Sequence, residues 1–238
     1  MKVVILAGGY GTRIAEETDE KPKPMVLLGN KPIIWHIMKY YASFGHKEFI
    51  ICCGYKGEII KNYFLKNSSK EEDWNIECVD TGLKTMTGGR LKRVSSYIDQ
   101  NETFLFTYGD GLSDINIDKL IEFHELNKVK ATVTAVFPPS RFGALQINDF
   151  GQVTSFEEKP KNDSFMINGG FFVLHKDVIN TIADDNTVWE KDPMEYLVKM
   201  NQLYAFKHRG FFLPMDTLRD KRQLESMWNQ NCALWKIW

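Results

Sequence analysis

The first two-thirds of the chain alternates short, continuously apolar segments with amphipathic segments, and this alternation restricts the folds open to it. A continuous apolar run predicts a strand buried on both faces, whereas the amphipathic segments have the spacing of one helical face. Strands are expected at Val3–Leu6, Glu48–Cys53, Ile76–Val79, Thr103–Thr107 and Ala131–Phe137, and helices at Ile33–Phe44, Glu58–Leu65, Gly89–Ile98 and Ile117–Leu126. Buried strands joined by helices form βαβ units, so we predict a mostly parallel sheet with both faces covered.

The pattern changes after Phe137, where short strands follow one another across polar turns. The segments Ala144–Ile147, Val153–Phe156 and Gly170–Leu174 each have the length and composition of a strand. Because the links between them are short, we expect antiparallel or mixed strands that close over the C-terminal edge of the sheet.

Two helices near the end of the chain are predicted by their capping residues. Asp192 and Pro193 favour a helix start, since Asp is a good N-cap and Pro fits the first turn. Thr217 and Asp220 have the spacing of a capping box, and a strand at Leu203–Phe206 lies between the two helices. No repeat or linker interrupts the sequence, so we expect residues 1–238 to form a single α/β domain whose central mixed, mostly parallel sheet is flanked by helices.

Composition excludes several classes of protein. A net charge of -1 argues against a general nucleic-acid binder, which usually carries a basic excess, but it leaves room for a small anionic substrate. The cysteines form no CxxC pair and are interpreted as small apolar residues in a reducing compartment: Cys52, Cys53, Cys78 and Cys232. The N-terminal apolar run is too short for a signal peptide, and no segment reaches the length of a membrane span. We therefore expect a cytoplasmic protein with no membrane or nucleic-acid partner.

A glycine-rich turn follows directly on the first predicted strand. Its sequence is Leu6-Ala7-Gly8-Gly9-Tyr10-Gly11-Thr12-Arg13. Three glycines in four positions allow backbone N–H groups to approach a phosphate closely. The turn lacks the third glycine of a Rossmann fingerprint and the GK[ST] of a Walker P-loop, so neither of those sites is predicted. A glycine turn beside solvated charges is the alternative interpretation.

Two cations near this turn favour the phosphate interpretation. Arg13 offers a planar fork of donors that matches phosphate oxygens, while Lys23 is a compact point charge. Pro22 and Pro24 stand on either side of Lys23 and stiffen its backbone. The segment therefore combines backbone donors with two positioned positive charges.

These residues resemble the signature of a known family. GGYGTR followed by KPKPM is similar to the GGxGTR…KPM pattern of the sugar-phosphate nucleotidylyltransferases. Further stretches resemble family members that use CTP and glucose 1-phosphate, and together they cover nearly the whole chain: KPIIWHIMKYY, FIICCGYKG, VDTG…MTGGRLKRV, FLFTYGDG, FPPSRFGAL, FEEKPK, INGGFFVL and PMDTLRDK. Between Tyr63 and Trp74 those members carry a longer insertion, and this chain has a short polar loop, which leaves its oligomeric state open.

The resemblance implies a Rossmann-like nucleotidyltransferase fold and a set of nucleotide-binding residues. Residues 1–137 would form the nucleotide-binding part, and residues 138–238 the sugar-phosphate-binding and C-terminal part. The implied nucleotide contacts are Leu6, Ala7, Gly8, Gly9, Gly11, Thr12, Arg13, Lys23, Thr85, Gly89, Arg90, Gly109 and Asp110. Of these, Thr85 and Arg90 are the candidates for contacts with cytosine.

The resemblance assigns Mg²⁺ to two aspartates, Asp110 and Asp216. Asp110 follows a predicted strand and has a glycine on each side, at the edge where open α/β sheets bind ligands. An aspartate in a type I turn would look the same, and Asp216 could instead stabilise a helix N-terminus. Asp114 is an alternative ligand, although its sequence context is closer to a helix cap. Mg²⁺ needs few carboxylates because it also binds waters and phosphate oxygens, so two aspartates are sufficient.

For the sugar phosphate, the resemblance implies contacts from Gly143, Glu158, Lys159, Asn168 and Gly169. Without the resemblance, Glu158 and Lys159 would be interpreted as a solvated strand end. An asparagine amide can both donate to and accept from sugar hydroxyls, which suits Asn168.

The implied reaction joins CTP to glucose 1-phosphate, and Arg13, Lys23, Asp110 and Asp216 are its catalytic residues. Arg13 would stabilise the departing pyrophosphate and Lys23 the α-phosphate, while Lys159 would hold the incoming sugar phosphate. Alternatives are another triphosphate such as UTP or dTTP, another sugar phosphate, or a non-catalytic sugar-nucleotide sensor.

The C-terminal segment is rich in tryptophan, with Trp228, Trp235 and Trp238. We expect these side chains to pack within the subunit; a homo-oligomer interface is the alternative.

Overall fold

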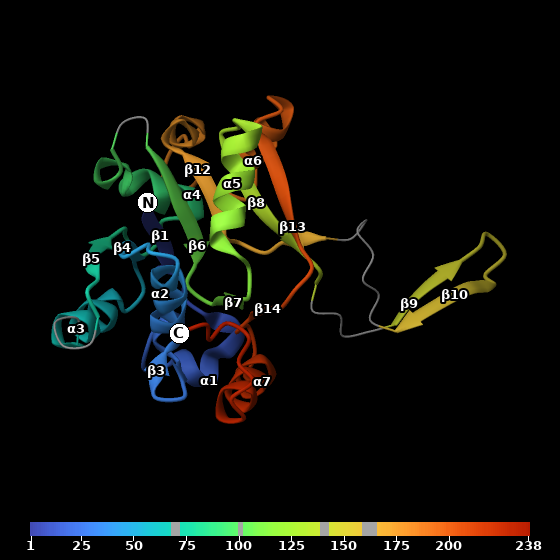
Figure 1. Ribbon diagram of the computed structural model, residues 1–238, viewed down its shortest axis with the longest axis horizontal. Helices are drawn as coiled ribbons and strands as arrows, with labels where there is room; N and C mark the ends of the chain where they lie inside the picture. The colour runs from blue at the N-terminus through green and yellow to red at the C-terminus, as the bar shows by residue number, and fades with distance from the viewer. Residues whose placement is uncertain (68–71, 100–101, 139–142, 159–165) are drawn as a thin grey trace.

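The computed structural model describes residues 1–67, 72–99, 102–138, 143–158 and 166–238 (Figure 1). Its centre is a mixed sheet in which β1 (Lys2–Ala7) runs parallel to both β4 (Glu48–Cys53) and β6 (Thr103–Tyr108). Beyond β4, β5 (Asn75–Asp80) continues the sheet in the parallel sense. These four strands match the predicted ones to within a residue at each end, because each is a buried apolar run between polar turns.

On the far side of β6 the sheet becomes antiparallel. Here β12 (Phe172–His175) pairs with both β6 and β8 (Ala131–Val136), and β11 (Ile167–Asn168) pairs with the end of β8. The last strand, β13 (Leu203–His208), runs parallel to β8. The predicted mixed, mostly parallel sheet is confirmed.

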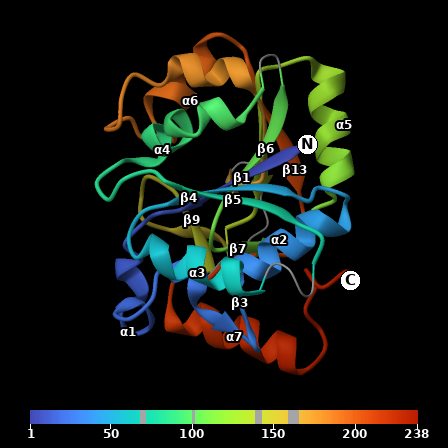
Figure 2. The same ribbon diagram turned by 90° about the vertical axis from the view of Figure 1, so that its left-hand side faces the viewer.

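Helices cover both faces of this sheet, as Figures 1 and 2 show. Side chains alternate along β1, so Val3 and Ile5 belong to one hydrophobic cluster and Val4 and Leu6 to the other. The first cluster is completed by α2 (Ile33–Ser43), α3 (Gly57–Asn67), α5 (Ile117–Asn127) and α7 (Leu218–Asn229), and the second by α4 (Thr87–Arg93), η5 (Lys176–Thr181) and α6 (Asp192–Lys199). Cys52 and Cys53 lie in different clusters, on opposite faces of the sheet as expected.

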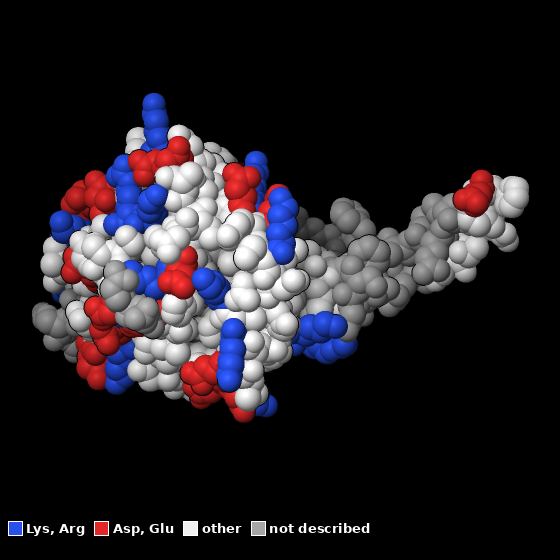
Figure 3. Space-filling model, turned by 90° about the horizontal axis from the view of Figure 1, so that it is seen from above, with Lys and Arg blue, Asp and Glu red and all other residues white. Residues whose placement is uncertain are grey.

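Short elements connect the strands and helices of the two layers. They are η1 (Thr12–Ile14), α1 (Ala15–Thr18), η2 (Lys23–Met25), β2 (Leu27–Leu28), β3 (Lys31–Pro32), η3 (Ser95–Tyr97), β7 (Gly111–Ser113) and β14 (Phe212–Pro214). No helix among the described residues is both long and apolar enough to cross a membrane. On the face seen in Figure 3, positive and negative side chains are interspersed, in keeping with the net charge of -1.

The segment after β8 departs from its prediction. β9 (Gly143–Ile147) and β10 (Val153–Glu158) pair with each other and form a separate two-stranded sheet, which extends away from the body in Figure 1. By contrast, β12 enters the main sheet instead of covering its edge. Its residues Phe172, Val173 and Leu174 are fully buried, and a strand with apolar side chains on both faces requires a place inside the sheet.

Two helix boundaries also differ from prediction. α4 ends at Arg93, and η3 follows it before the predicted end at Ile98. At α6 the N-cap is Lys191, so Asp192 lies in the first turn and Pro193 follows it. The capping box of Thr217 and Asp220 at the start of α7 is confirmed.

The C-terminal tryptophans pack inside the subunit, against α2. Trp235 is fully buried, and its Nε1 lies 3.5 Å from Nδ1 of the equally buried His36. The other ring nitrogen of His36, Nε2, lies 2.9 Å from the carbonyl oxygen of Leu28. Since that carbonyl can only accept and the indole N–H can only donate, His36 is a neutral imidazole with its proton on Nε2. Burial lowers the pKa of His36 to about 4.

This arrangement predicts loss of stability in mild acid. His36 is protonated more readily in the unfolded chain, with a pKa of 6.5, than in the folded one. Protonation therefore lowers the free energy of the unfolded state relative to the folded state as the pH falls below 6.5. At pH 5 the loss from His36 alone is about 2 kcal/mol. Urea unfolding at pH 7 and pH 5 measures it. His36→Gln removes the titrating group and should make this pH dependence shallower; an equally steep dependence in the variant would contradict the assignment.

Candidate active site

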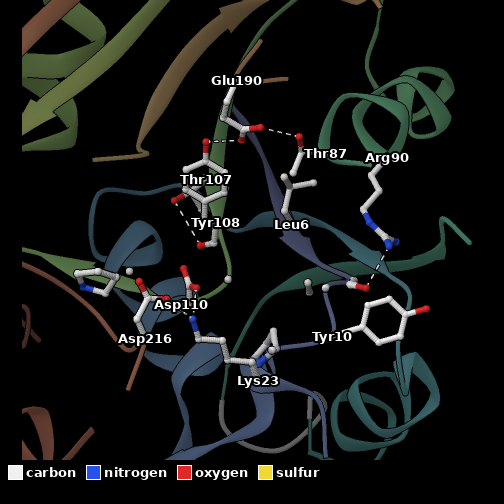
Figure 4. A pocket seen from close by; sticks show the side chains of 18 of the residues that line it. Leu6, Tyr10, Lys23, Thr87, Arg90, Thr107, Tyr108, Asp110, Glu190 and Asp216 are labelled. Carbon is white, nitrogen blue, oxygen red and sulfur yellow. Dashed lines mark hydrogen bonds and ion pairs between the residues drawn. The ribbon is translucent and has the colours of Figure 1, made fainter. Parts of the chain in front are cut away.

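A cavity of about 860 Å³ opens at the C-terminal ends of β1 and β6 (Figure 4). The glycine turn after β1 forms one wall, and the segment after β6 and the segment after β14 form another. Its lining includes Leu6, Ala7, Gly8, Gly9, Gly11, Thr12, Arg13, Lys23, Thr85, Arg90, Gly109, Asp110, Asn168, Gly169 and Asp216. The structure thus brings together residues that are spread over more than 200 positions of the sequence.

Lys23 lies at the centre of a charge cluster in this cavity. Its Nζ donates to Oδ2 of Asp110 at 2.6 Å and to Oδ1 of Asp216 at 2.7 Å. The second oxygen of Asp216 accepts from Nη1 of Arg13, also at 2.7 Å. Lys23 is buried, which by itself lowers the pKa of its ammonium, but the two carboxylates outweigh burial and raise that pKa above its ordinary value. Lys23 therefore remains a cation here.

Backbone pairing brings the two aspartates to this point. β7 and β14 are antiparallel with Gly111 opposite Pro214, and the N–H of Met215 donates to the carbonyl of Asp110 at 2.9 Å. The carboxylates of Asp110 and Asp216 consequently face the same ammonium from two segments distant in sequence.

Arg90 supports the glycine turn from behind. Its guanidinium donates to the carbonyl of Gly8 at 3.0 Å, to Oγ1 of Thr81 at 2.7 Å and to the carbonyl of Gly82 at 2.8 Å. It also reaches the carbonyl of Cys53. A Cβ at position 8 would come within 2.1 Å of Arg90 Nη1, so Gly8 is required for this approach.

The Arg90 charge is held by neutral oxygens. Among the described residues no carboxylate forms an ion pair with Arg90, and burial lowers the pKa of the guanidinium. Because its partners are backbone carbonyls and one hydroxyl, its positive charge stays uncancelled beneath the turn. Thr85 and Arg90 both line the cavity, but the donors of Arg90 are directed to the protein, so a contact with cytosine stays a prediction.

Gly89 has a different place from the one predicted. Its N–H and that of Gly88 donate to the carbonyl of Thr187, and a Cβ on Gly89 would come within 2.6 Å of the backbone of Asp185. Gly89 is absent from the described cavity lining. The paired glycines allow α4 to pack against this backbone, and that is a structural reason for their presence.

Asp114 lies outside the charge cluster as well. Its Oδ1 lies 2.8 Å from Nε2 of His208 and accepts from the N–H of Phe211 at 2.6 Å. It holds the turn that precedes β14, and the N-cap of α5 is Asn116.

The sugar-phosphate residues are only partly placed. Asn168 and Gly169 line the cavity. Gly143 and Glu158 are the first residue of β9 and the last of β10, and Lys159 lies outside the described residues. Sequence reasoning missed Thr87, Tyr108 and Glu190, which also line the cavity. Tyr108 could have been found from its position directly before Gly109-Asp110, whereas Glu190 has no sequence signal.

The donor set of Asp110 and Asp216 fits a magnesium ion. One ammonium nitrogen already lies within 2.7 Å of an oxygen from each aspartate, so both carboxylates can reach a single cation. The described residues contain no cluster of three or more His, Cys, Asp or Glu side chains suited to a metal. Two carboxylates are the usual protein contribution where phosphate oxygens and waters complete the shell of Mg²⁺.

Comparison with known proteins agrees with this geometry. The family model described as nucleotidyl transferase matches residues 2–234. The chain is 55% identical to glucose-1-phosphate cytidylyltransferase of Salmonella typhimurium and 43% identical to a probable glucose-1-phosphate cytidylyltransferase of Bacillus subtilis, in both cases over the whole of each chain. The crystal structure of HddC from Yersinia pseudotuberculosis, complexed with GMP-PN, superposes with a TM-score of 0.75 at 26% identity, covering 95% of this chain and 99% of that one.

Arg90→Lys should destabilise the protein although it keeps the charge. A lysine has three donors without the planar fork, so carbonyls now held by Arg90 would lose their partner, at a cost of about 2 kcal/mol or more in unfolding free energy. Urea denaturation provides the measurement. Arg93→Lys on the same helix is the matched control, because Arg93 pairs with Asp185 at the surface and should tolerate the change. Equal stabilities of the two variants would refute the supporting role of Arg90.

Proposed function

This chain belongs to the nucleotidyl transferase family, and we propose that it transfers a cytidylyl group from CTP to glucose 1-phosphate, giving CDP-glucose and pyrophosphate. The observation that carries the proposal is the 55% identity over the full length with an enzyme of that name. The geometry supports it independently, since a glycine turn, two cations and two carboxylates converge on one cavity.

The chemistry asks mainly for positioning and charge neutralisation. An oxygen of the sugar phosphate attacks the α-phosphorus of CTP, and the bond to pyrophosphate breaks in line with it. Because this nucleophile is already an anion, no general base is required. We assign the stabilisation of the departing pyrophosphate to Arg13 and of the α-phosphate to Lys23, with the N–H groups of the glycine turn binding the phosphates.

We propose Asp110 and Asp216 as the residues that hold Mg²⁺. The cluster of Arg13, Lys23 and the two aspartates has formal charges that cancel, whereas a nucleoside triphosphate adds several negative charges. When bound, the ion would neutralise triphosphate oxygens and act as a Lewis acid on them. Lys23, freed from the carboxylates, would then be available to the α-phosphate.

For the acceptor, we propose that Asn168 and Gly169 bind the sugar, together with Gly143, Glu158 and Lys159. Asn168 is exposed at the cavity and can both donate and accept hydrogen bonds, as a sugar hydroxyl requires. The other three belong to the β9–β10 hairpin or to the residues after it.

Either aspartate should be required for turnover. In Asp110→Asn or Asp216→Asn the loss of a charged ligand should lower kcat by roughly 10²-fold or more, while the fold stays intact. Pyrophosphate release with CTP, glucose 1-phosphate and Mg²⁺ measures this, and EDTA should abolish the wild-type rate. Asp118→Asn, on the exposed face of α5, is the matched control and should keep wild-type activity. Full turnover by both active-site variants would refute the assignment.

The same assay distinguishes the alternatives for substrate and class. A grid of CTP, UTP and dTTP against several sugar 1-phosphates should give its highest kcat/KM for CTP with glucose 1-phosphate. A higher kcat/KM for another pair would contradict the proposed substrates and identify that pair as the substrates instead. Binding without pyrophosphate release from any pair would support a sugar-nucleotide sensor.

A further inference from the structure

Glu190 anchors a chain of hydrogen bonds that crosses one side of the cavity (Figure 4). Its Oε2 accepts from Oγ1 of Thr87 at 2.7 Å, and its Oε1 accepts from the hydroxyl of Tyr108 at 2.6 Å. The Tyr108 oxygen in turn accepts from Nδ2 of Asn168 at 3.1 Å. The chain therefore links three segments of the cavity wall through side chains alone.

The direction of every bond in this chain follows from Glu190. A carboxylate only accepts, so the single proton of the Tyr108 hydroxyl must point to it. The Tyr108 oxygen can then only accept, and Asn168 must turn its NH₂ group toward it. The N–H of Gly170 donates to Oδ1 of Asn168 at 2.8 Å, which requires the same orientation of the amide. Among the described residues, the Nδ2 group of Asn168 donates only to Tyr108, which leaves its second N–H for a ligand, and Asn168 lines the cavity.

We propose that Glu190 is a positioning residue for the sugar acceptor: through Tyr108 it orients Asn168 so that one amide N–H points to a hydroxyl of the sugar 1-phosphate. This inference rests on the proposed function, because it concerns the acceptor of that reaction. It adds a residue that neither the sequence motifs nor the charge cluster identifies.

The charges in the cavity indicate that this chain of hydrogen bonds lies away from the site of the phosphates. Glu190 forms no ion pair with a cation among the described residues, and an uncompensated carboxylate repels a phosphate but not a hydroxyl. Figure 4 shows Glu190 and Lys23 on opposite sides of the cavity. The side that holds Glu190, Tyr108 and Asn168 is thus suited to a neutral polyol.

Packing holds the hydrogen-bonded side chains rigidly enough to orient a ligand. Trp189 is fully buried beside Glu190, and its backbone N–H donates to Oγ1 of Thr87 at 2.9 Å. The Tyr108 ring packs edge-on against Phe106 and Phe172. These contacts hold the side chains of Thr87 and Tyr108 in place, so their hydrogen bonds to Glu190 keep the directions given above.

The test compares Glu190→Ala, Tyr108→Phe and the double variant in the full chain with CTP and glucose 1-phosphate. Removing a hydrogen bond to a charged group should raise KM for glucose 1-phosphate roughly ten-fold in Glu190→Ala. KM for CTP, and the CTP dissociation constant measured by calorimetry without sugar, should stay close to wild type. Since Glu190 acts through Tyr108, the double variant should be no worse than the worse single variant.

Two further variants separate orientation from simple packing. Glu190→Gln should retain most of the wild-type KM, because its Oε1 can accept from Tyr108 while its Nε2 donates to Oγ1 of Thr87. Glu195→Ala, an exposed glutamate on the neighbouring α6, should leave all constants unchanged. Melting temperatures of all variants show whether they fold. If Glu190→Ala does not fold, Tyr108→Phe still tests the proposal.

The outcomes are distinct. An active wild type whose KM for glucose 1-phosphate is unchanged in Glu190→Ala and Tyr108→Phe overturns this inference and leaves the proposed function in place. Additive losses in the double variant, or weakened CTP binding, also overturn it, because Glu190 would then contact a substrate directly. A wild type that turns over no sugar 1-phosphate refutes the proposed function and this inference with it.

Discussion

The site depends on one ion-pair arrangement, in which the buried ammonium of Lys23 lies between the carboxylates of Asp110 and Asp216. A buried charge is costly unless it is paired, and two carboxylates this close repel each other unless a cation separates them. The two carboxylates therefore offset the cost of burying the Lys23 ammonium, and the ammonium offsets the repulsion between the carboxylates. The three residues come from η2, the turn after β6 and the segment after β14, so this arrangement also joins the first, middle and last parts of the chain at one point.

The second buried cation, Arg90, is compensated in a different way, and the difference has a consequence. Lys23 is neutralised by carboxylates, whereas Arg90 is solvated by carbonyls and a hydroxyl, among them the carbonyl of Gly8. The carbonyls that Arg90 draws backward cannot face the cavity, which favours N–H groups of the glycine turn on the ligand side. Its uncancelled charge adds to their positive potential, a preorganised setting for an anion.

The sequence predicted where strands and helices lie better than it predicted which strands pair and which side chains meet. Buried apolar runs gave β1, β4, β5 and β6 almost to the residue, because such runs tolerate no other environment. The pairing of β9 with β10 alone could not be read from alternation, which predicts a strand but not its neighbour. The turn residues around Gly8 and Gly11 were predicted from local spacing, and Asp110 from its place between two glycines after a strand. The pairing of Asp110 with Asp216 came only from resemblance, since the two residues are remote in sequence. Glu190 escaped both routes, because its partners Thr87 and Tyr108 lie 103 and 82 positions away.

In the proposed reaction, the two sides of the cavity would bind their ligands by different physical interactions. Charge–charge contacts fall off slowly with distance and have little directionality, so the exposed Arg13 can follow phosphate groups as they separate. Hydrogen bonds weaken steeply when they are misaligned, so a chain with every proton direction assigned discriminates between hydroxyl geometries. Arg13 is 74% exposed while Tyr108 is held between aromatic rings, which matches this division between an adaptable side and a rigid one. In the proposed transfer the phosphates rearrange and the sugar ring does not. A mobile side chain near the phosphates and rigid side chains near the sugar therefore suit this reaction.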